Sequence, residues 1–334
     1  MNLQILSFGQ ALPKRVIRNQ ELESLLNTTD EWIQQRSGIQ QRHWVGPGET
    51  TLSMATEASA QALQRAQLNI DQIDLIIFGC LLSDYVFPGT GCLLQHSLGA
   101  KNNIPALDIR NQCSGFLYAL NVARAFIESG IYRKILIVGS EIHSNRLNKT
   151  PEGRDVAVLF GDGAGACVVA ATQDSAPQSS RIVDLHLASQ GENANVLCVK
   201  EPASGFDFRR DLQSVDQANL FPHMEGRLVF KNAVERMQES LKLLLQRNSL
   251  QASDIDFVIA HQANMRINSM VLEQLKIPPT KTHNTIERFG NTTMATIPLT
   301  MGEAVQLGKI KRGDLVALVA FGAGFTWGSA LLRY

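Results

Sequence analysis

Short apolar runs bounded by glycine or polar residues recur along the chain and alternate with longer segments of helical character. Residues 75–79, 135–138, 166–169, 257–260 and 315–317 are runs of this kind, rich in Ile, Val, Leu and Phe. Continuous apolar runs of this length are typical of strands that helices cover on both faces of a sheet. The pattern therefore predicts an α/β fold with buried strands.

The same pattern occurs twice in the chain. Residues 68–79 match residues 250–261, because each segment has a helix exit, an Ile-Asp pair and then a buried strand. Residues 125–138 parallel residues 304–317, where a helix closed by glycine precedes a strand. Self-similarity at a fixed offset indicates a duplicated architecture. We therefore expect two similar halves that share one α/β plan.

The register of this repeat places Cys113 and Asn291 at equivalent strand-to-helix joints. Cys113 lies 17 positions before the helix-closing Gly130, and Asn291 lies 17 positions before Gly308 (130 − 113 and 308 − 291). His261 follows a strand of the second half. Because open α/β sheets bind ligands beyond the carboxyl ends of their strands, the three residues are candidates for one site.

The length and composition of the chain are consistent with two domain-sized halves. A chain of 334 residues with 44% hydrophobic and 19% charged residues can bury a large core. We expect an N-terminal half over residues 1–173 that carries Cys113, and a C-terminal half over residues 180–334 that carries His261 and Asn291.

The charge balance argues against nucleic acid or a membrane as the main partner. Lys plus Arg and Asp plus Glu both number 31, so the chain has no strong overall field. The N-terminus lacks a basic segment followed by a long apolar one, and no later stretch has 18 uninterrupted apolar residues. We therefore expect a cytoplasmic protein.

The cysteines favour free thiols in a reducing compartment. All five are widely spaced and none forms a CxxC motif, so neither a disulfide framework nor a metal site is predicted. At the start of a helix, the free N–H groups and the helix dipole favour the thiolate of Cys113. The alternative is that Cys113 is a small core residue, which is a common use of free cysteine.

Each of the other two candidates also has an ordinary structural alternative. His261 can serve as a hydrogen-bonded histidine at a strand end, and Asn291 can serve as a helix N-cap. Together with Cys113, however, they suit one reaction. A thiolate that holds an acyl group, with an imidazole and an amide that stabilise an oxyanion or enolate, is what a condensation of thioesters needs. The glycine-rich run 161–165 lies between two strands, which favours a turn over a phosphate-binding loop.

Several motifs together resemble the β-ketoacyl-acyl-carrier-protein synthase III family of the thiolase superfamily. They are Cys113-Ser114-Gly115-Phe116, the segments 159–166, 261–267 and 321–330, and Gly290-Asn291-Thr292-Thr293. The likeness covers essentially the whole chain. It implies a thiolase-like five-layered αβαβα fold built from two similar halves, and a homodimer.

The resemblance also implies a reaction and its substrates. Cys113 would take an acyl group from acyl-CoA, and His261 and Asn291 would bind the thioester carbonyl of malonyl-acyl-carrier protein while carbon dioxide leaves. The backbone N–H groups of Cys113 and Ala323 would form the oxyanion hole. No cofactor is implied, because CoA enters as part of a substrate.

Further residues take their expected roles from the same resemblance. The positions expected to bind CoA are Thr28, Trp32, Arg36, Arg154 and Asn264, with Trp32 and Arg154 stacked against the adenine. Lys231 and Arg266 match positions where the carrier protein docks. Phe87 resembles the residue that reaches across the dimer and limits the length of the acyl group.

Some positions depart from the usual pattern of the family. Arg110-Asn111-Gln112 precede the nucleophile where small residues are usual, and Arg227, Asp155, Ala323 and Met294 replace Asn, Gly, Gly and a small residue. These departures leave the acyl donor open. The chain can be a primer enzyme of fatty-acid synthesis, a pathway-specific ketosynthase with a longer or unusual acyl donor, or a non-catalytic subunit that binds acyl groups.

Overall fold

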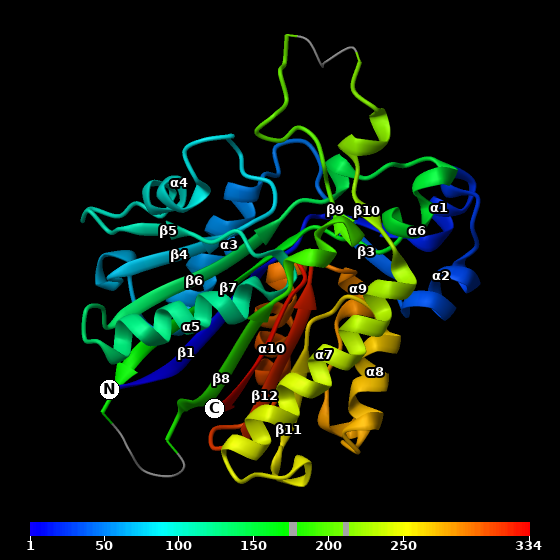
Figure 1. The fold of residues 1–334 in the computed structure, drawn as a ribbon. Helices are drawn as coiled ribbons and strands as arrows, with labels where there is room; N and C mark the ends of the chain where they lie inside the picture. Colours follow the sequence, from blue (N-terminus) through cyan, green and yellow to red (C-terminus); the bar gives the residue numbers. More distant parts are fainter. Residues whose placement is uncertain (174–178, 210–213) are drawn as a thin grey trace.

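Two β-sheets face each other across a layer of helices in the computed structural model, which describes residues 1–173, 179–209 and 214–334 (Figure 1). The first sheet has the order β1-β7-β6-β4-β5, and the second has the order β11-β12-β13-β8. Their strands are β1 (Asn2–Ala11), β4 (Leu75–Gly79), β5 (Ala106–Asp108), β6 (Lys134–Glu141), β7 (Gly163–Thr172), β8 (Arg181–Ser189), β11 (Phe257–Ala260), β12 (Leu315–Gly322) and β13 (Thr326–Arg333).

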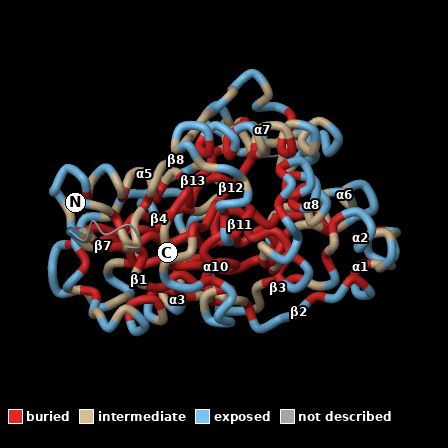
Figure 2. The backbone as a smooth tube through the Cα atoms, turned by 90° about the horizontal axis from the view of Figure 1, so that it is seen from below, coloured by how far each residue is buried: buried red, intermediate tan, exposed pale blue. Residues whose placement is uncertain are grey.

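Helices form three layers around these sheets. Helix α3 (Thr51–Arg65) covers the outer face of the first sheet, α5 (Gly115–Glu128) and α10 (Thr296–Gln306) lie between the sheets, and α7 (Gly226–Arg247) and α8 (Met265–Gln274) cover the second. Figure 2 shows α7 and α3 at opposite sides of the buried sheets. The layers are αβαβα, as expected.

The remaining elements lie around the ends of the sheets, apart from α4, which packs beside α3 on the outer face of the first sheet. They are β2 (Arg15–Arg18), β3 (Gln41–Trp44), β9 (Leu197–Cys198), β10 (His223–Met224), α1 (Asn19–Leu26), α2 (Asp30–Ser37), α4 (Thr90–Ser97), α6 (Arg154–Ala157) and α9 (Ile286–Phe289). Among all the helices of the described residues, none has both the length and the apolar character needed to span a bilayer.

The Ile-Asp pair of each repeat has a structural role. Asp74 accepts hydrogen bonds from the backbone N–H groups of Arg133 and Lys134, both at 2.8 Å, and Asp256 accepts one from Leu315 N–H, also at 2.8 Å. Each carboxylate thus holds the start of the neighbouring parallel strand, β6 in one half and β12 in the other. The strands of each pair therefore end at a common edge.

Candidate active site

Cys113 lies at the carboxyl edge of the first sheet, where the chain turns from β5 into α5. It is the middle residue of a single 3₁₀ turn, Gln112–Ser114, that leads directly into the helix. The hydroxyl of Ser114 lies 2.7 Å from that of Thr326 on β13, so the turn is tied to the second sheet. The strand-to-helix joint expected from the sequence is present.

The sulfur of Cys113 is held by backbone N–H groups in a buried setting. The N–H groups of Cys113 and Ala323 both hydrogen-bond the thiol. Burial nevertheless raises the pKa of Cys113 to about 12, and the nearby Glu141 adds to this rise. The resting group is therefore a thiol, because burial outweighs the helix N-terminus that the sequence suggested would favour a thiolate.

His261 follows β11 and faces the same cavity. Its backbone N–H donates to Val319 O at 2.8 Å, and its Nδ1 lies 2.6 Å from the hydroxyl of Thr296. Burial lowers the pKa of His261 to about 3, so the imidazole is neutral at pH 7. Its Nε2 is buried and has no hydrogen-bond partner among the residues that the structure describes, which leaves this atom for a substrate.

Asn291 follows helix α9, not a strand as the repeat predicted, and a 3₁₀ turn then leads into α10; an isolated bridge to Phe160 gives this position limited strand character. Its backbone pairs with the strand-like segment beside it, since Asn291 N–H donates to Leu159 O at 2.9 Å and Gly161 N–H donates to Asn291 O at 3.1 Å. The side-chain oxygen accepts from Thr293 N–H at 2.9 Å. This contact fixes which end of the amide is oxygen and leaves the NH₂ group as its donor end.

One cavity of about 630 Å³ brings Cys113, His261 and Asn291 together. Gly322 also lines it, beside the nucleophile. The cavity extends outward past Phe230 of α7. Its rim is formed by polar and aromatic side chains near the surface, which are Trp32, Arg36, Asp155, Arg227, Asn264 and Arg266. The three candidates, distant in sequence, therefore share one site.

Trp32 lies at this rim between two guanidinium groups. The carbon centre of Arg36 is 4.9 Å from the ring centre, and that of Arg154 is 4.7 Å from it. Both are direct cation–π contacts. The stack predicted from the sequence is thus already closed, and an adenine can reach the Arg154 side of Trp32 only if Arg154 moves away.

The other two residues expected to bind CoA have local roles. Asn264 caps α8, because its oxygen accepts from Arg266 N–H at 2.9 Å, and its NH₂ donates to Arg36 O at 2.9 Å. It thereby joins α8 to α2 at the cavity rim. Thr28 lies just before the α2 N-cap; its hydroxyl is buried and unpartnered, and it is not among the residues that line the cavity.

The residues expected to meet other proteins are exposed. The guanidinium carbon of Arg266 lies 5.5 Å from the ring centre of Phe230. Lys231 is the next residue of α7 after Phe230, and its side chain is exposed. Phe87 is 85% exposed and lies beside the fully exposed Val86. Within this single chain, Phe87 is therefore outside the cavity that holds Cys113.

Sequence reasoning missed a group of buried polar residues behind the site. Thr293 and Thr296 contact Asn291 and His261, while Glu141 and His143 contact Thr293 from the first half. One available signal was a carboxylate and an imidazole directly after the apolar strand 135–139.

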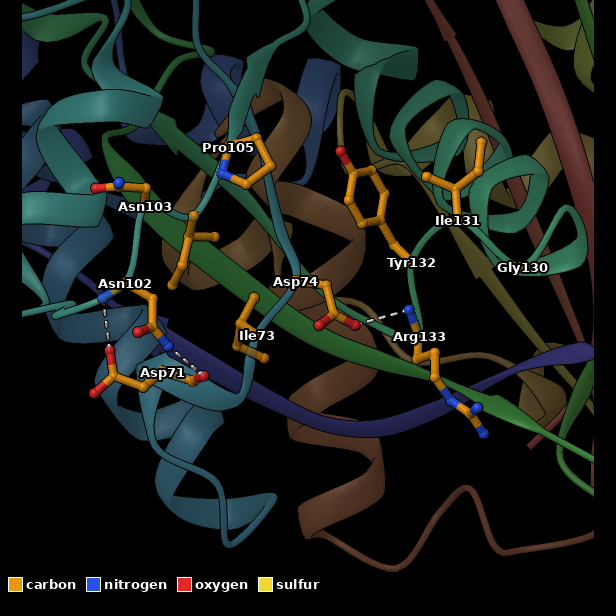
Figure 3. Close-up of a pocket in the computed structure, with 11 residues that line it drawn as sticks. Asp71, Ile73, Asp74, Asn102, Asn103, Pro105, Gly130, Ile131, Tyr132 and Arg133 are labelled. Carbon is orange, nitrogen blue, oxygen red and sulfur yellow. Dashed lines mark hydrogen bonds between the residues drawn. The ribbon is translucent and has the colours of Figure 1, made fainter.

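Figure 3 shows a second cavity, of about 480 Å³, at the amino ends of β4 and β6. Its two carboxylates are already engaged. Asp71 accepts from the N–H groups of Lys101 and Asn102 at 2.7 and 3.3 Å, and Asp74 accepts from Arg133 N–H at 2.8 Å. The carboxylates of this cavity thus serve the backbone, and it lies at the opposite end of the strands from Cys113.

Comparisons with known proteins agree along the whole chain. Residues 107–191 match the family model 3-oxoacyl-[acyl-carrier-protein] synthase III, and residues 245–334 match the model of its C-terminal part. The chain is 40% identical to the β-ketoacyl-[acyl-carrier-protein] synthase III of Alkalilimnicola ehrlichii, with 99% of each chain covered.

Solved structures of the same kind superpose closely. The 3-oxoacyl-[acyl-carrier-protein] synthase III of Aquifex aeolicus is 38% identical with a TM-score of 0.90, covering 99% of this chain and 100% of that one. The priming β-ketosynthase of the R1128 polyketide pathway is 28% identical with a TM-score of 0.88, covering 99% and 96%. These likenesses confirm the thiolase-like fold expected from the sequence. The chain belongs to the 3-oxoacyl-[acyl-carrier-protein] synthase III family.

Proposed function

We propose that the chain is a condensing acyltransferase that joins an acyl group from acyl-CoA to malonyl-acyl-carrier protein, releases carbon dioxide and forms a 3-oxoacyl product. One observation carries this proposal. Cys113, His261 and Asn291 line one cavity, and two backbone N–H groups point at the sulfur of Cys113. The proposed setting is the cytoplasm, and the reaction is the first condensation of fatty-acid synthesis.

In the first half-reaction, Cys113 attacks the thioester carbon of acyl-CoA. Its thiol loses a proton as the bond forms, and CoA leaves with a proton on its sulfur. The N–H groups of Cys113 and Ala323, which bond the sulfur in the resting state, are placed to bond the carbonyl oxygen as it gains charge. Donors aimed at such an oxyanion typically contribute about 3 kcal/mol each to the lowering of the barrier.

In the second half-reaction, the malonyl thioester carbonyl lies between His261 and Asn291. The NH₂ of Asn291 is free to donate because its oxygen is held by Thr293, and the unpartnered Nε2 of His261 faces the same space. Carbon dioxide leaves, the enolate carbon attacks the acyl-Cys113 carbonyl, and the Cys113 sulfur departs and regains a proton. The sequence of a covalent intermediate and a second substrate gives ping-pong kinetics.

The cavity rim carries basic side chains that can bind CoA and the acyl-carrier protein. Arg36, Arg227 and Arg266 line it, and guanidinium groups suit the phosphates of CoA and of the carrier's prosthetic arm. Lys231, exposed beside them on α7, adds a further cation for an acidic carrier protein. Such charges mainly accelerate association.

A homodimer is part of the proposal. Strand β5 is only three residues long and forms one edge of the first sheet, with Leu107 exposed on it. Val86 and Phe87 are also exposed large hydrophobic residues on the loop that precedes α4, which packs against β5. A second copy paired at this edge would cover these apolar side chains.

Acyl transfer to Cys113 and condensation can be tested separately. Mass spectrometry should find an acyl adduct on Cys113 after mixing with acyl-CoA, and none in Cys113→Ala. Radiolabelled malonyl-acyl-carrier protein should then give a labelled 3-oxoacyl product. Equal labelling of wild type and variant, or no product from any acyl-CoA, would refute the assignment and favour an acyl-binding subunit.

A pathway-specific ketosynthase is the second candidate. Arg227 lines the cavity where the usual family member has Asn, and the R1128 priming enzyme shares this fold. A series of acyl-CoA donors separates the two functions. Preference for short donors supports the primer role, whereas preference for long or unusual donors supports the specialised one.

A further inference from the structure

Thr293 is hydrogen-bonded directly to Asn291 and, through the Thr296 hydroxyl, is linked to His261. Its N–H donates to the Asn291 side-chain oxygen at 2.9 Å, and its carbonyl accepts from the Thr296 hydroxyl, also at 2.9 Å. That hydroxyl lies 2.6 Å from Nδ1 of His261. Thr293 therefore connects the amide of Asn291 to the imidazole of His261 through hydrogen bonds.

The Thr293 side chain is in turn held by the first half of the chain. Its hydroxyl lies 3.3 Å from Nε2 of His143 and beside the Glu141 carboxyl, whose pKa is raised by burial and lowered in part by this hydroxyl. Glu141 is fully buried at the end of β6 and accepts from Leu81 N–H at 2.8 Å. His143 is buried against the ring of Phe160, with 4.5 Å between ring centres.

We call Glu141 and His143, together with the Thr293 hydroxyl that they contact, the clamp. The backbone conformation of Thr293 explains why these contacts are needed. Its φ is +43°, in the left-handed region that β-branched residues rarely adopt. Such conformations persist only where the surroundings impose them, and they cluster at functional sites. If the hydroxyl contacts are lost, the peptide is free to relax, and its N–H and carbonyl no longer fix Asn291 and Thr296.

We propose that Thr293 is a positioning residue for the condensation step, through which Glu141 and His143 hold Asn291 and His261 in place. This inference rests on the proposed function. The Cys113 sulfur has its own N–H donors, Cys113 itself and Ala323, and Glu141, which together with burial raises the pKa of this thiol, stays in place when Thr293 or His143 is replaced. Damage to the clamp should therefore affect condensation and spare acylation.

Three variants test the clamp. Thr293→Val keeps the shape and the β-branch but removes the hydroxyl, Thr293→Ser restores it, and His143→Phe keeps the ring but removes the nitrogen that faces Thr293. Thr292→Val is the matched control, since the Thr292 side chain packs beside Gly163. Each variant is assayed for CoA release from acyl-CoA and, separately, for condensation of its pre-acylated form with malonyl-acyl-carrier protein.

We expect Thr293→Val to slow condensation about 10- to 100-fold, the range that ångström-scale misplacement produces, with acylation within about twofold of wild type. His143→Phe should show the same split to a smaller degree, and Thr293→Ser should restore condensation. Equal loss in both half-reactions, or failure of the serine variant to rescue, would overturn the proposal.

Crystal structures of the Thr293 variants without substrate test whether Thr293 determines the positions of the Asn291 and His261 side chains. The Asn291 amide and the His261 ring should shift in Thr293→Val and keep their places in Thr293→Ser. Unmoved side chains in the valine variant refute the clamp, whatever the activity. If wild type performs neither half-reaction, the proposed function fails, while these structures still decide whether Thr293 positions the two side chains.

Discussion

A β-carbon placed on Gly322 would lie 2.5 Å from the Cβ of Cys113 and 3.2 Å from its sulfur. Real side chains do not approach this closely, so the end of β12 can reach the nucleophile only because residue 322 has no side chain. The close approach places the N–H of the next residue, Ala323, on the sulfur. The oxyanion hole that we propose therefore depends on a glycine that contributes no functional group.

Gly322→Ala should abolish acylation while the protein stays folded. The added methyl group pushes β12 away from Cys113 and removes one of two oxyanion donors, a loss typically of about 100-fold or more. CoA release from acyl-CoA measures it, and circular dichroism checks the fold. Gly191→Ala, where an added β-carbon meets nothing within 4 Å, is the matched control. Near-normal acylation in Gly322→Ala would contradict the proposed geometry.

The thiol of Cys113 should react with iodoacetamide slowly at neutral pH. Burial raises its pKa to about 12, and only the thiolate is nucleophilic, so the rate should increase about tenfold per pH unit from pH 7 to 9. Subtracting the rate of Cys113→Ala removes the contribution of the exposed Cys92. A plateau below pH 9 would mean that the helix N-terminus outweighs burial.

Glu141 should make the protein less stable as pH rises from 4.5 toward 7. Burial raises its pKa from 4.5 to about 7, so in this window the folded protein binds a proton that the unfolded chain releases. The stability due to that proton is complete below pH 4.5 and is lost as pH approaches 7. Thermal unfolding of Glu141→Gln should show a flatter pH dependence, with Glu57→Gln, an exposed position on α3, as the control. An unchanged slope would exclude Glu141 as its source.

Trp32→Ala should weaken the use of acyl-CoA and spare shorter donors. Loss of the indole removes the surface proposed to stack on the adenine of CoA beside Arg36 and Arg154; a contact of roughly 1 kcal/mol corresponds to a rise in KM for acyl-CoA of about 5-fold. Acyl-pantetheine lacks the adenine and is the control substrate. A similar increase in KM for both donors would show that Trp32 acts on the fold or on the inner cavity.

Met294→Ala should destabilise the whole chain by about 2–5 kcal/mol. The Met294 side chain fills a slot whose walls are Gly79, Gly115 and Gly139, where added β-carbons would lie 2.2, 2.8 and 2.8 Å from its atoms. Removing it leaves a cavity that rigid backbone cannot fill. Denaturant unfolding measures the loss, and Met294→Leu should recover most of it. A loss below about 1 kcal/mol would show that the slot collapses.

The sequence predicted the fold, and the meeting of Cys113, His261 and Asn291 in one cavity, because both follow from local patterns. Buried strands are continuous apolar runs, and the repeat aligned Cys113 with Asn291 before any contact was known. Met294 is larger than the residue usual at its position in the family. The space for its side chain comes from three glycines, Gly79 on β4, Gly139 on β6 and Gly115 at the start of α5. No local pattern links those glycines to Met294.

Other properties depend on burial and on long-range contacts. The sequence placed Cys113 at a helix start and so favoured a thiolate, but the extent of its desolvation follows from how closely β12 approaches it at Gly322. The direct contact of Arg154 with Trp32 joins positions 122 residues apart (154 − 32). The clamp on Thr293 likewise joins Glu141 and His143 to a loop about 150 residues away (293 − 143).

The shared middle layer has a consequence for whether either half could fold alone. One core cluster contains residues of α5 and α10 together with residues of both sheets, so each half covers the apolar face of the other. A single copy of the repeat would need a second copy to cover that face. The two halves thus depend on each other to bury their apolar faces, and at matching positions of the repeat one half places the thiol of Cys113 and the other the amide of Asn291.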